Sequence, residues 1–260
     1  MEEDAISELK REYINRLFAE SRRIDGRAPD ETRPVSVETG VIKNADGSAR
    51  VRLGETDVLV GVKMELGQPF PDTPDKGVLV TNAELIPMAS PYFEPGPPRP
   101  ESIELARVVD RGIREAQTID LASLCITPKE KVWVAFVDIH ALDFSGNLFD
   151  AASLGALMAL NTTTVPAKKH ELGEDFRLKV DHYPISCTSV KIDRGLLVDP
   201  CLDEERVARA RLTVTTDENG DIRAMQKGIG GKLTFDEVRA MIATSQRVGR
   251  ELRRRFNLGV

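Results

Sequence analysis

The feature that most constrains the fold is an order of elements, strands first and a helix after them, that occurs in both parts of the chain. In the first part, β-type runs and helical spacing predict strands at 35–37, 48–53, 56–64, 78–86 and 131–142 and helices at 101–116 and 150–160. In the second part they predict strands near 185–192, 196–198, 210–215 and 222–227 and a helix at 235–256, which opens with a capping box of Thr234 and Glu237. This order indicates an α+β fold rather than a doubly wound sheet.

Two further segments precede or separate these units. Residues 1–30 combine a predicted helix over 3–20 with an arm in which Asp25-Gly26 and prolines break regular structure. The apolar positions of that helix are Ile6, Leu9, Tyr13, Leu17 and Phe18. Residues 167–184 are polar, with few apolar positions at either period, which indicates a linker. The sequence therefore divides into 1–30, 31–166, 167–184 and 185–260.

Composition excludes several classes of protein. The formal net charge of the 260 residues is −6, whereas a domain covered by nucleic acid would be basic, so contact with nucleic acid requires a local basic patch. Cys125, Cys187 and Cys201 form no Cys-x-x-Cys pair, which argues against a disulfide framework or zinc site and favours a reducing compartment. The acidic first residues are unlike a signal peptide, and no apolar run reaches the length of a membrane span. We therefore expect a cytoplasmic protein without membrane contact.

Several short motifs follow one another along the chain. They are Arg-Ile-Asp-Gly-Arg at 23–27 with Arg33-Pro34, a hairpin sequence at 47–63, a helix sequence at 104–114, and Val-Asp-Pro at 198–200 followed by Asp-Glu-Glu-Arg at 203–206 and Arg-Leu-Thr-Val at 211–214. In this order and spacing they resemble the ribonuclease PH family over nearly the whole chain. The resemblance implies a ribonuclease PH-type fold, with mixed sheets packed against helices in two βα subdomains, domain 1 at 31–166 and domain 2 at 185–260.

Within this family the chain is similar in particular to the non-catalytic ring subunits of archaeal exosomes. That resemblance implies a hexameric ring, a trimer of heterodimers, in which such a subunit alternates with a catalytic RNase PH-like subunit. It further implies RNA-binding cap subunits on the ring and single-stranded RNA in the central channel, where phosphate attacks the 3′ end.

The resemblance also identifies where active members bind phosphate. In those members a Gly-Gly-Thr-Arg-Thr turn leads into a helix, where backbone N–H groups, the helix dipole and a guanidinium favour an anion. The aligned segment here runs from Gly146 to Asp150, so Leu148 replaces a threonine and Phe149 replaces the arginine. We expect Asp150 to cap the helix and to repel an incoming anion.

The carboxylates of active members are only partly present. Glu204 and Glu205 occupy the first acidic pair, but the later aspartate aligns with Arg211, which can neither position a divalent metal nor accept a proton. An arginine before the central helix aligns with Glu101, and Arg99 close by is a candidate for RNA binding. The resemblance thus implies a chain that is not itself an enzyme and needs no cofactor or metal.

The helix at 101–116 carries the most informative surface. At ~100° per residue, Arg107, Arg111 and Arg114 lie within about 60° of one another. The opposite, apolar face consists of Leu105, Val108, Val109, Gly112 and Ala116. From the residues alone, the arginines can form an ordinary solvated face with ion pairs Glu104–Arg107 and Asp110–Arg114. The resemblance instead implies that Arg107 and Arg111, with Arg114 as a further candidate, contact RNA beside catalytic residues that belong to the partner.

Two other functions remain open. The chain can itself be an active phosphate-dependent 3′–5′ exoribonuclease that uses Asp199, Glu204 and Glu205, or a purely structural ring subunit without RNA contact. A metal enzyme is less favoured, because His140 and Asp138 share a strand face without a third ligand and are expected to form a buried hydrogen-bonded pair.

Overall fold

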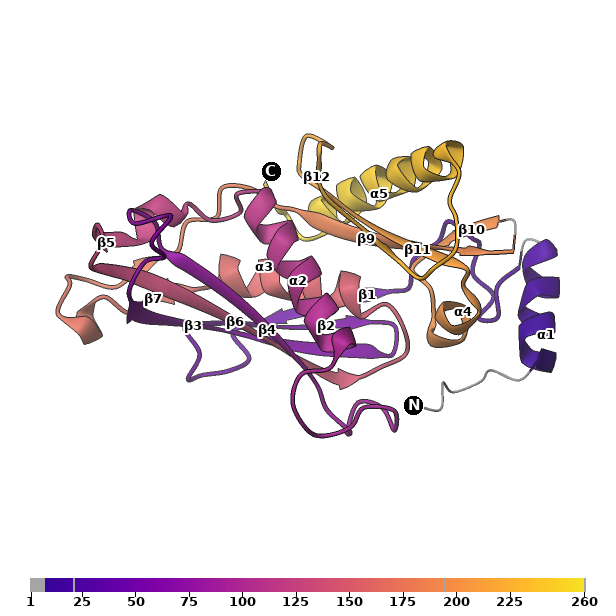
Figure 1. The fold of residues 1–260 in the computed structure, drawn as a ribbon, viewed down its shortest axis with the longest axis horizontal. Coiled ribbons are helices and arrows are strands. Elements are labelled where there is room, and N and C mark those ends of the chain that lie inside the picture. Colours follow the sequence, from indigo (N-terminus) through magenta and orange to yellow (C-terminus); the bar gives the residue numbers. More distant parts are fainter. Residues whose placement is uncertain (1–7, 21, 194, 260) are drawn as a thin grey trace.

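The computed structural model describes residues 8–20, 22–193 and 195–259 and stacks four layers of secondary structure (Figure 1). The helices α2 (Pro100–Glu115) and α3 (Leu148–Asn161) pack on a first sheet, a second sheet covers these helices, and α5 (Phe235–Arg255) covers the second sheet. Each sheet thus buries a face against helices. The α+β fold predicted from the order of the elements is confirmed.

The first sheet has six strands in the order β1-β2-β3-β6-β4, with β5 paired to β6 beside this path. Its pairs are antiparallel except for β4 and β6, which run parallel and are connected through α2. The strands are β1 (Val35–Thr39), β2 (Gly47–Leu53), β3 (Thr56–Gly67), β4 (Val78–Leu85), β5 (Cys125–Thr127) and β6 (Lys131–Asp143). The β-type runs of the sequence predict each of these strands except the three-residue β5.

The second sheet has the order β10-β9-β11-β12, and all of its strand pairs are antiparallel. Mixed parallel and antiparallel pairing was expected in both sheets, but it occurs only in the first sheet of the described chain. Its strands are β9 (Ile185–Ile192), β10 (Gly195–Val198), β11 (Ala210–Thr216) and β12 (Ile222–Gly228). A short helix, α4 (Leu202–Val207), joins β10 to β11 and contains the Asp-Glu-Glu-Arg motif. The predicted capping box of α5 is present: Thr234 Oγ1 accepts from the Glu237 amide at 3.2 Å, and Glu237 Oε2 accepts from the Thr234 amide at 2.8 Å.

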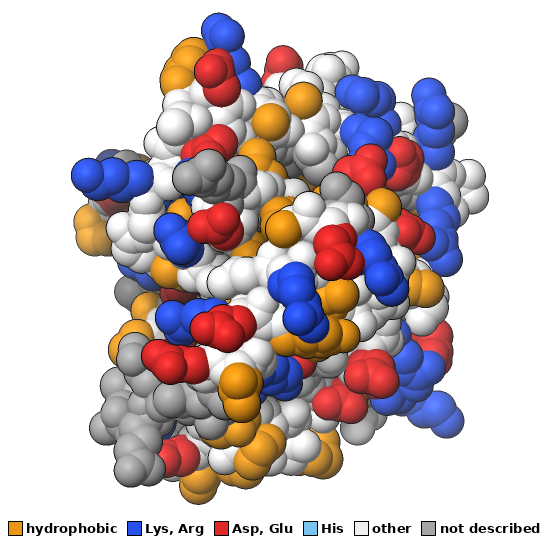
Figure 2. Space-filling model, turned by 90° about the vertical axis from the view of Figure 1, so that its right-hand side faces the viewer, with side chains coloured by type: hydrophobic (Ala, Val, Ile, Leu, Met, Phe, Trp, Pro, Cys, Tyr) orange, Lys and Arg blue, Asp and Glu red, His pale blue; other side chains and the backbone are white. Residues whose placement is uncertain are grey.

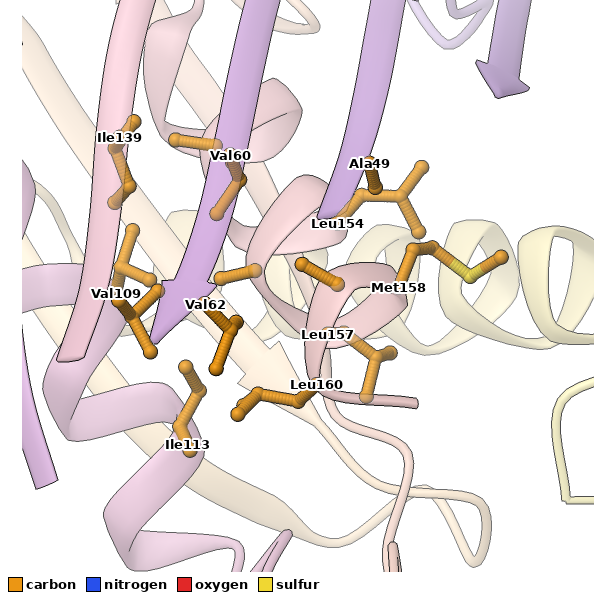
Figure 3. Close-up of a cluster of buried hydrophobic side chains, with 14 of the residues drawn as sticks. Ala49, Val60, Val62, Val109, Ile113, Ile139, Leu154, Leu157, Met158 and Leu160 are labelled. Atoms are coloured by element: carbon orange, nitrogen blue, oxygen red, sulfur yellow. The ribbon is translucent and has the colours of Figure 1, made fainter. Parts of the chain in front are cut away.

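Helix α3 is buried on all sides because it lies between the two sheets. Twelve of its 14 residues are buried, and Figure 3 shows Leu154 and Leu157 among side chains of the first sheet such as Val60. A Cβ on Gly155 would lie only 2.8 Å from a methyl group of Val60, so glycine permits this close approach of helix and strand. None of the described helices is long and apolar enough to span a bilayer.

The N-terminal helix differs from its expected packing. In α1 (Glu8–Ala19), Leu9 is 80% exposed and Tyr13 is 45% exposed, although both belong to the expected apolar face. Ile14 is the buried residue of this helix, and Ile6 lies outside the described residues. Phe18 of the expected apolar face packs with Ile14 against the second domain, so the apolar spacing marks the helix correctly and identifies its packed side in part.

The polar segment at 167–184 carries regular structure of its own. Here β8 (Phe176–Arg177) pairs with β7 (Thr164–Val165), Ile119 forms a bridge with Val180, and short 3₁₀ turns lie at Lys168–His170 and, earlier, at Leu121–Leu124. These contacts hold the segment against the part of the chain that forms the first sheet, residues 31–166. Two-residue strands are too short to give a hydrophobic period.

Candidate functional site

Residues 146–150, at the start of α3, form the turn that the resemblance aligns with the phosphate-binding turn of active family members. Asn147 adopts a left-handed conformation with φ of 55°, and its side-chain oxygen accepts from the Asp150 amide at 3.4 Å. Asparagine tolerates this conformation and caps the helix, so α3 begins at Leu148. The expectation that Asp150 caps the helix is therefore wrong.

Asp150 is instead an acceptor between the two domains. Its carboxylate accepts from Asn147 Nδ2 at 2.8 Å, from the Thr188 amide at 3.0 Å and from Thr188 Oγ1 at 2.7 Å. Burial raises the pKa of Asp150 to about 7, although these hydrogen bonds act in the opposite direction. The carboxyl group is thus only partly ionised near neutral pH, and its repulsion of an anion is weaker than expected.

The two substituted positions of the turn are filled by apolar side chains. Leu148 and Phe149 are 7% and 8% exposed and belong to the main core. The guanidinium of Arg211 lies 4.2 Å from the centroid of the Phe149 ring, a cation–π distance. Phe149 and Arg211, at which the resemblance implies the loss of an arginine and of a carboxylate, therefore pack against each other.

The two remaining glutamates have different surroundings. Glu204 is buried and accepts two hydrogen bonds from Arg23, at 2.9 and 2.6 Å, and one from the Cys201 amide at 2.9 Å. Glu205 accepts from the Asn147 amide at 2.9 Å, and burial raises its pKa to about 7 against the opposing effects of that bond and of nearby arginines. Glu204 is committed to an ion pair, and Glu205 is held beside the turn.

The centre of this network is Asp199, which the sequence offers only as a catalytic group of the alternative enzyme and not as a partner of these arginines. Arg33 binds its carboxylate through Nε at 3.0 Å and Nη2 at 2.7 Å, Arg27 Nη1 donates at 3.0 Å, and Asn147 Nδ2 donates at 2.7 Å. Burial would raise the pKa of Asp199, but the hydrogen bonds and charge of Arg33 lower it. We name Arg23, Arg27 and Arg33 the junction arginines, because they tie the N-terminal arm to both domains. Their signal in the sequence was the arginine-rich motif at 23–33.

A second set of arginines lies on α2, and its packing matches the prediction. Leu105, Val108, Val109, Gly112 and Ala116 are buried, whereas Arg107, Arg111 and Arg114 are exposed. Arg107 and Arg111 line an open groove between α2 and β12, with a volume of about 370 Å³, together with Pro100, Ile103, Glu104, Val108 and Gln226. We call Arg107 and Arg111 the groove arginines.

Only one of the two ion pairs expected on α2 is formed. Arg114 binds Asp110 at 2.9 Å and also donates to the Leu79 carbonyl at 3.1 Å. The expected Glu104–Arg107 pair is absent because Glu104 binds Arg211 of β11 at 2.5 Å. Among the described residues, none makes an ion pair or hydrogen bond with the Arg107 guanidinium.

The other candidate RNA-binding arginines, Arg111 and Arg99, have partners within the protein. Arg111 Nη1 donates to Gln226 Oε1 at 3.4 Å, and Arg99 forms an ion pair with Glu94. Figure 2 shows the end of the molecule that carries α1, where Lys and Arg side chains alternate with Asp and Glu and with hydrophobic groups. On the described part of that face no extended basic field is present.

The predicted His140–Asp138 pair is not formed. Both side chains point toward β4, where His140 Nδ1 lies 3.5 Å from Glu84 Oε2 and Asp138 Oδ1 accepts from Asn82 Nδ2 at 3.2 Å. Residues two apart on a strand each meet a different neighbour on the adjacent strand. Within the described ranges, no cluster of three or more His, Cys, Asp or Glu side chains is arranged to hold a metal ion.

The chain is similar to known proteins over nearly its whole length. A model of the 3′ exoribonuclease family, domain 1, matches residues 31–166, and the model of domain 2 of that family matches residues 182–248. The chain is 53% identical over 256 residues to the exosome complex component Rrp42 of Methanocella arvoryzae, covering 98% of each chain. It is 51% identical over 259 residues to Rrp42 of Archaeoglobus fulgidus, covering 98% of this chain and 99% of the relative.

Solved structures give the same relationship. A chain of the Archaeoglobus fulgidus exosome with RNA bound to the active site superposes with a TM-score of 0.93 at 51% identity, covering 95% of this chain and 98% of that one. A chain of an archaeal exosome core superposes with a TM-score of 0.91 at 47% identity, covering 99% and 100%.

Proposed function

The chain belongs to the 3′ exoribonuclease family of ribonuclease PH-type proteins, and from this we propose that it is a non-catalytic ring subunit of an archaeal exosome. In this role it alternates with a catalytic RNase PH-like subunit in a hexameric ring, a trimer of heterodimers. The ring carries RNA-binding cap subunits and degrades single-stranded RNA from the 3′ end by phosphorolysis. We place this assembly in the cytoplasm.

The filled turn at α3 supports the non-catalytic part of this proposal. Phosphorolysis requires a pocket that holds inorganic phosphate beside a second anion, the scissile phosphodiester. Here Leu148 and Phe149 occupy the turn, and Arg211 is bound to Glu104 and stacked on Phe149. The acidic groups of the alternative mechanism are engaged as well, since Asp199 binds Arg33 and Glu204 binds Arg23.

The proposal that the chain binds RNA rests on the exposed guanidinium of Arg107, which is unpaired within the described part of the chain. Its guanidinium is exposed at an open groove and has no acidic partner among the described residues, while Arg111 of the same groove has only a 3.4 Å contact with an amide oxygen. Phosphate groups of RNA are suitable partners for such guanidinium groups. A subunit of this kind contributes cations to a site whose reactive groups belong to its neighbour.

Reconstitution tests the proposal. The purified chain and its catalytic relative are examined separately and mixed, by mass in solution and by phosphate-dependent decay of a single-stranded RNA. We expect an inactive chain alone and an active mixture at the mass of six subunits.

The same experiment separates the alternatives. Phosphate-dependent release of nucleoside diphosphates by the chain alone would establish it as an enzyme and overturn its non-catalytic role. An active ring whose RNA affinity is unaffected when both groove arginines are replaced would refute RNA binding by the groove and favour a purely structural subunit.

A further inference from the structure

Glu104 is the one acidic side chain among the residues that line the groove. It precedes Arg107 by three positions on α2, a spacing at which helix side chains are neighbours and oppositely charged groups pair. A free carboxylate at this position would either bind Arg107 or repel a phosphate group that approaches the groove.

The structure turns Glu104 away from Arg107. Its Oε1 accepts from Arg211 Nη2 at 2.5 Å, an ion pair in which the side chains are 34% and 14% exposed. Arg211 belongs to β11 in the second domain, so this bond joins the two domains directly beside the groove.

Two contacts hold the Arg211 guanidinium in place. One is the Phe149 ring, whose centroid lies 4.2 Å away. The other is Gly228, the residue opposite Arg211 on β12, where a Cβ would lie 2.3 Å from Arg211 Nη2. An aromatic residue beneath Arg211 and a glycine beside it leave room for an arginine at this position.

We propose that Arg211 is a positioning residue for the groove: by binding Glu104, it leaves Arg107 without an acidic partner and keeps the groove positively charged. The effect of this arrangement on RNA binding rests on the proposed function. The pairing of Glu104 with Arg211 instead of Arg107 does not depend on that function. Arg211 therefore acts through Glu104 and does not itself contact the ligand.

The test uses the full-length chain, alone and assembled with its catalytic partner, and a labelled single-stranded oligouridylate in phosphate-free buffer. Arg211→Met keeps a side chain that packs on Phe149 but removes the charge, and we expect RNA affinity to fall about three-fold, the scale of one partly exposed ion pair. Arg211→Lys retains the cation and should keep most of the affinity. Glu104→Gln in the Arg211→Met background should restore it, because no carboxylate then competes for Arg107.

These variants separate an electrostatic role from a structural one. Loss of affinity in Arg211→Met that Glu104→Gln fails to restore would mean that Arg211 supports only the local structure, and the inference would fail. Equal affinity of Arg211→Met and the unmodified chain, in a ring whose affinity does fall when Arg107 and Arg111 are replaced, would overturn it as well. Glu104→Gln alone should change affinity less than Arg211→Met does, because Glu104 is already neutralised.

A crystal structure, which requires no RNA, tests the inference separately from the proposed function. In a crystal structure of the Arg211→Met variant, we expect the Glu104 carboxylate within ion-pair distance of Arg107. A carboxylate that stays away from Arg107 would refute the inference. By contrast, unchanged RNA binding after replacement of both groove arginines would refute RNA binding by the groove and leave this structural result standing.

Discussion

The junction arginines and the groove arginines show two uses of the same side chain. The guanidinium of Arg23 is fully buried, and that of Arg33 is 8% exposed, and both are bound to carboxylates through short, paired hydrogen bonds. Arg107 and Arg111 are exposed beside a groove and bind no carboxylate among the described residues. Where every donor has a partner, an arginine holds the protein together, and where donors remain open it can bind a ligand.

The same comparison supports the proposal that the turn at α3 does not bind phosphate. Domain contacts surround it: Asn147 binds Asp199, Asp150 binds Thr188, and the Asn147 amide binds Glu205. A backbone amide and side-chain donors that would face an anion are satisfied within the protein. The turn is part of the joint between the domains, whereas Arg107 and Arg111 on α2 remain exposed.

The largest effect is expected at the junction. Arg33→Met removes one partner of a buried ion pair and leaves the Asp199 carboxylate with fewer donors, so the free energy of unfolding should fall by about 3–5 kcal/mol. Denaturant unfolding measures this change. Arg209→Met is the matched control, because its pair with Asp193 is exposed and should contribute less than about 0.5 kcal/mol. Equal losses in the two variants would contradict the structural role of the junction.

A smaller effect on stability but a clear effect on binding is expected at the groove. Replacement of both Arg107 and Arg111 by alanine should lower the slope of log affinity against log salt by about 1.4, the value for two phosphate contacts on a single strand. RNA binding of the assembled ring, measured over a range of salt, tests this. Arg114→Ala is the control, since Arg114 is bound to Asp110 and should change the slope less.

The third effect depends on pH and concerns Asp150. Because its pKa is raised from 3.8 to about 7 in the folded chain, the neutral form stabilises the fold at acidic pH, and this stabilisation is lost as pH rises through 7. Asp150→Asn stays neutral and can donate to Thr188 Oγ1. Its advantage in unfolding free energy should therefore grow by about 2–3 kcal/mol between about pH 5 and about pH 8.

Asp217 provides the opposite sign as a control for that prediction. Burial would raise its pKa, but hydrogen bonds from the Asp221 amide and Arg223 lower it, so the ionised form stabilises the fold above its unfolded pKa. Asp217→Asn should be destabilising near neutral pH. An advantage of Asp150→Asn that is independent of pH would refute the assigned ionisation.

The smallest effect is expected from restoring a single carboxylate. Arg211→Asp leaves Leu148 and Phe149 in the turn, so the purified chain should still release no nucleoside diphosphate from RNA in the presence of phosphate. Robust activity from this one change would show that the turn is not closed to phosphate.

Local pattern was sufficient for much of the fold. The strands β3, β6 and β9 are rich in β-branched residues and long enough to identify, and α2 shows apolar residues at helical spacing. The burial of Leu105, Val108 and Val109 followed directly from that spacing. Short elements such as β5, β7 and β8 lack a measurable period and could not be predicted in this way.

For the candidate site, the sequence predicts the exposure of individual residues but not which charged groups pair with one another. The arginine face of α2 and the apolar residues at Leu148 and Phe149 are visible in the sequence, and both have the expected burial. The partner of each charged group is not visible, because Glu104 had a neighbour at Arg107 yet binds Arg211, which is 107 residues away. The cap at Asn147 depends on a backbone conformation that residue spacing does not reveal.

The junction also has a consequence for the order of folding. Arg23 and Arg33 are 181 and 166 residues away from Glu204 and Asp199 along the chain. At a synthesis rate of about 5–20 residues per second, the arm is made roughly ten to thirty seconds before its partners. Domain 1 can form its sheet in that interval, whereas the arm can dock only after α4 has been made. We therefore expect the docking of the arm to be among the last steps of folding, and a chain cut short before α4 to leave these guanidinium groups in solvent.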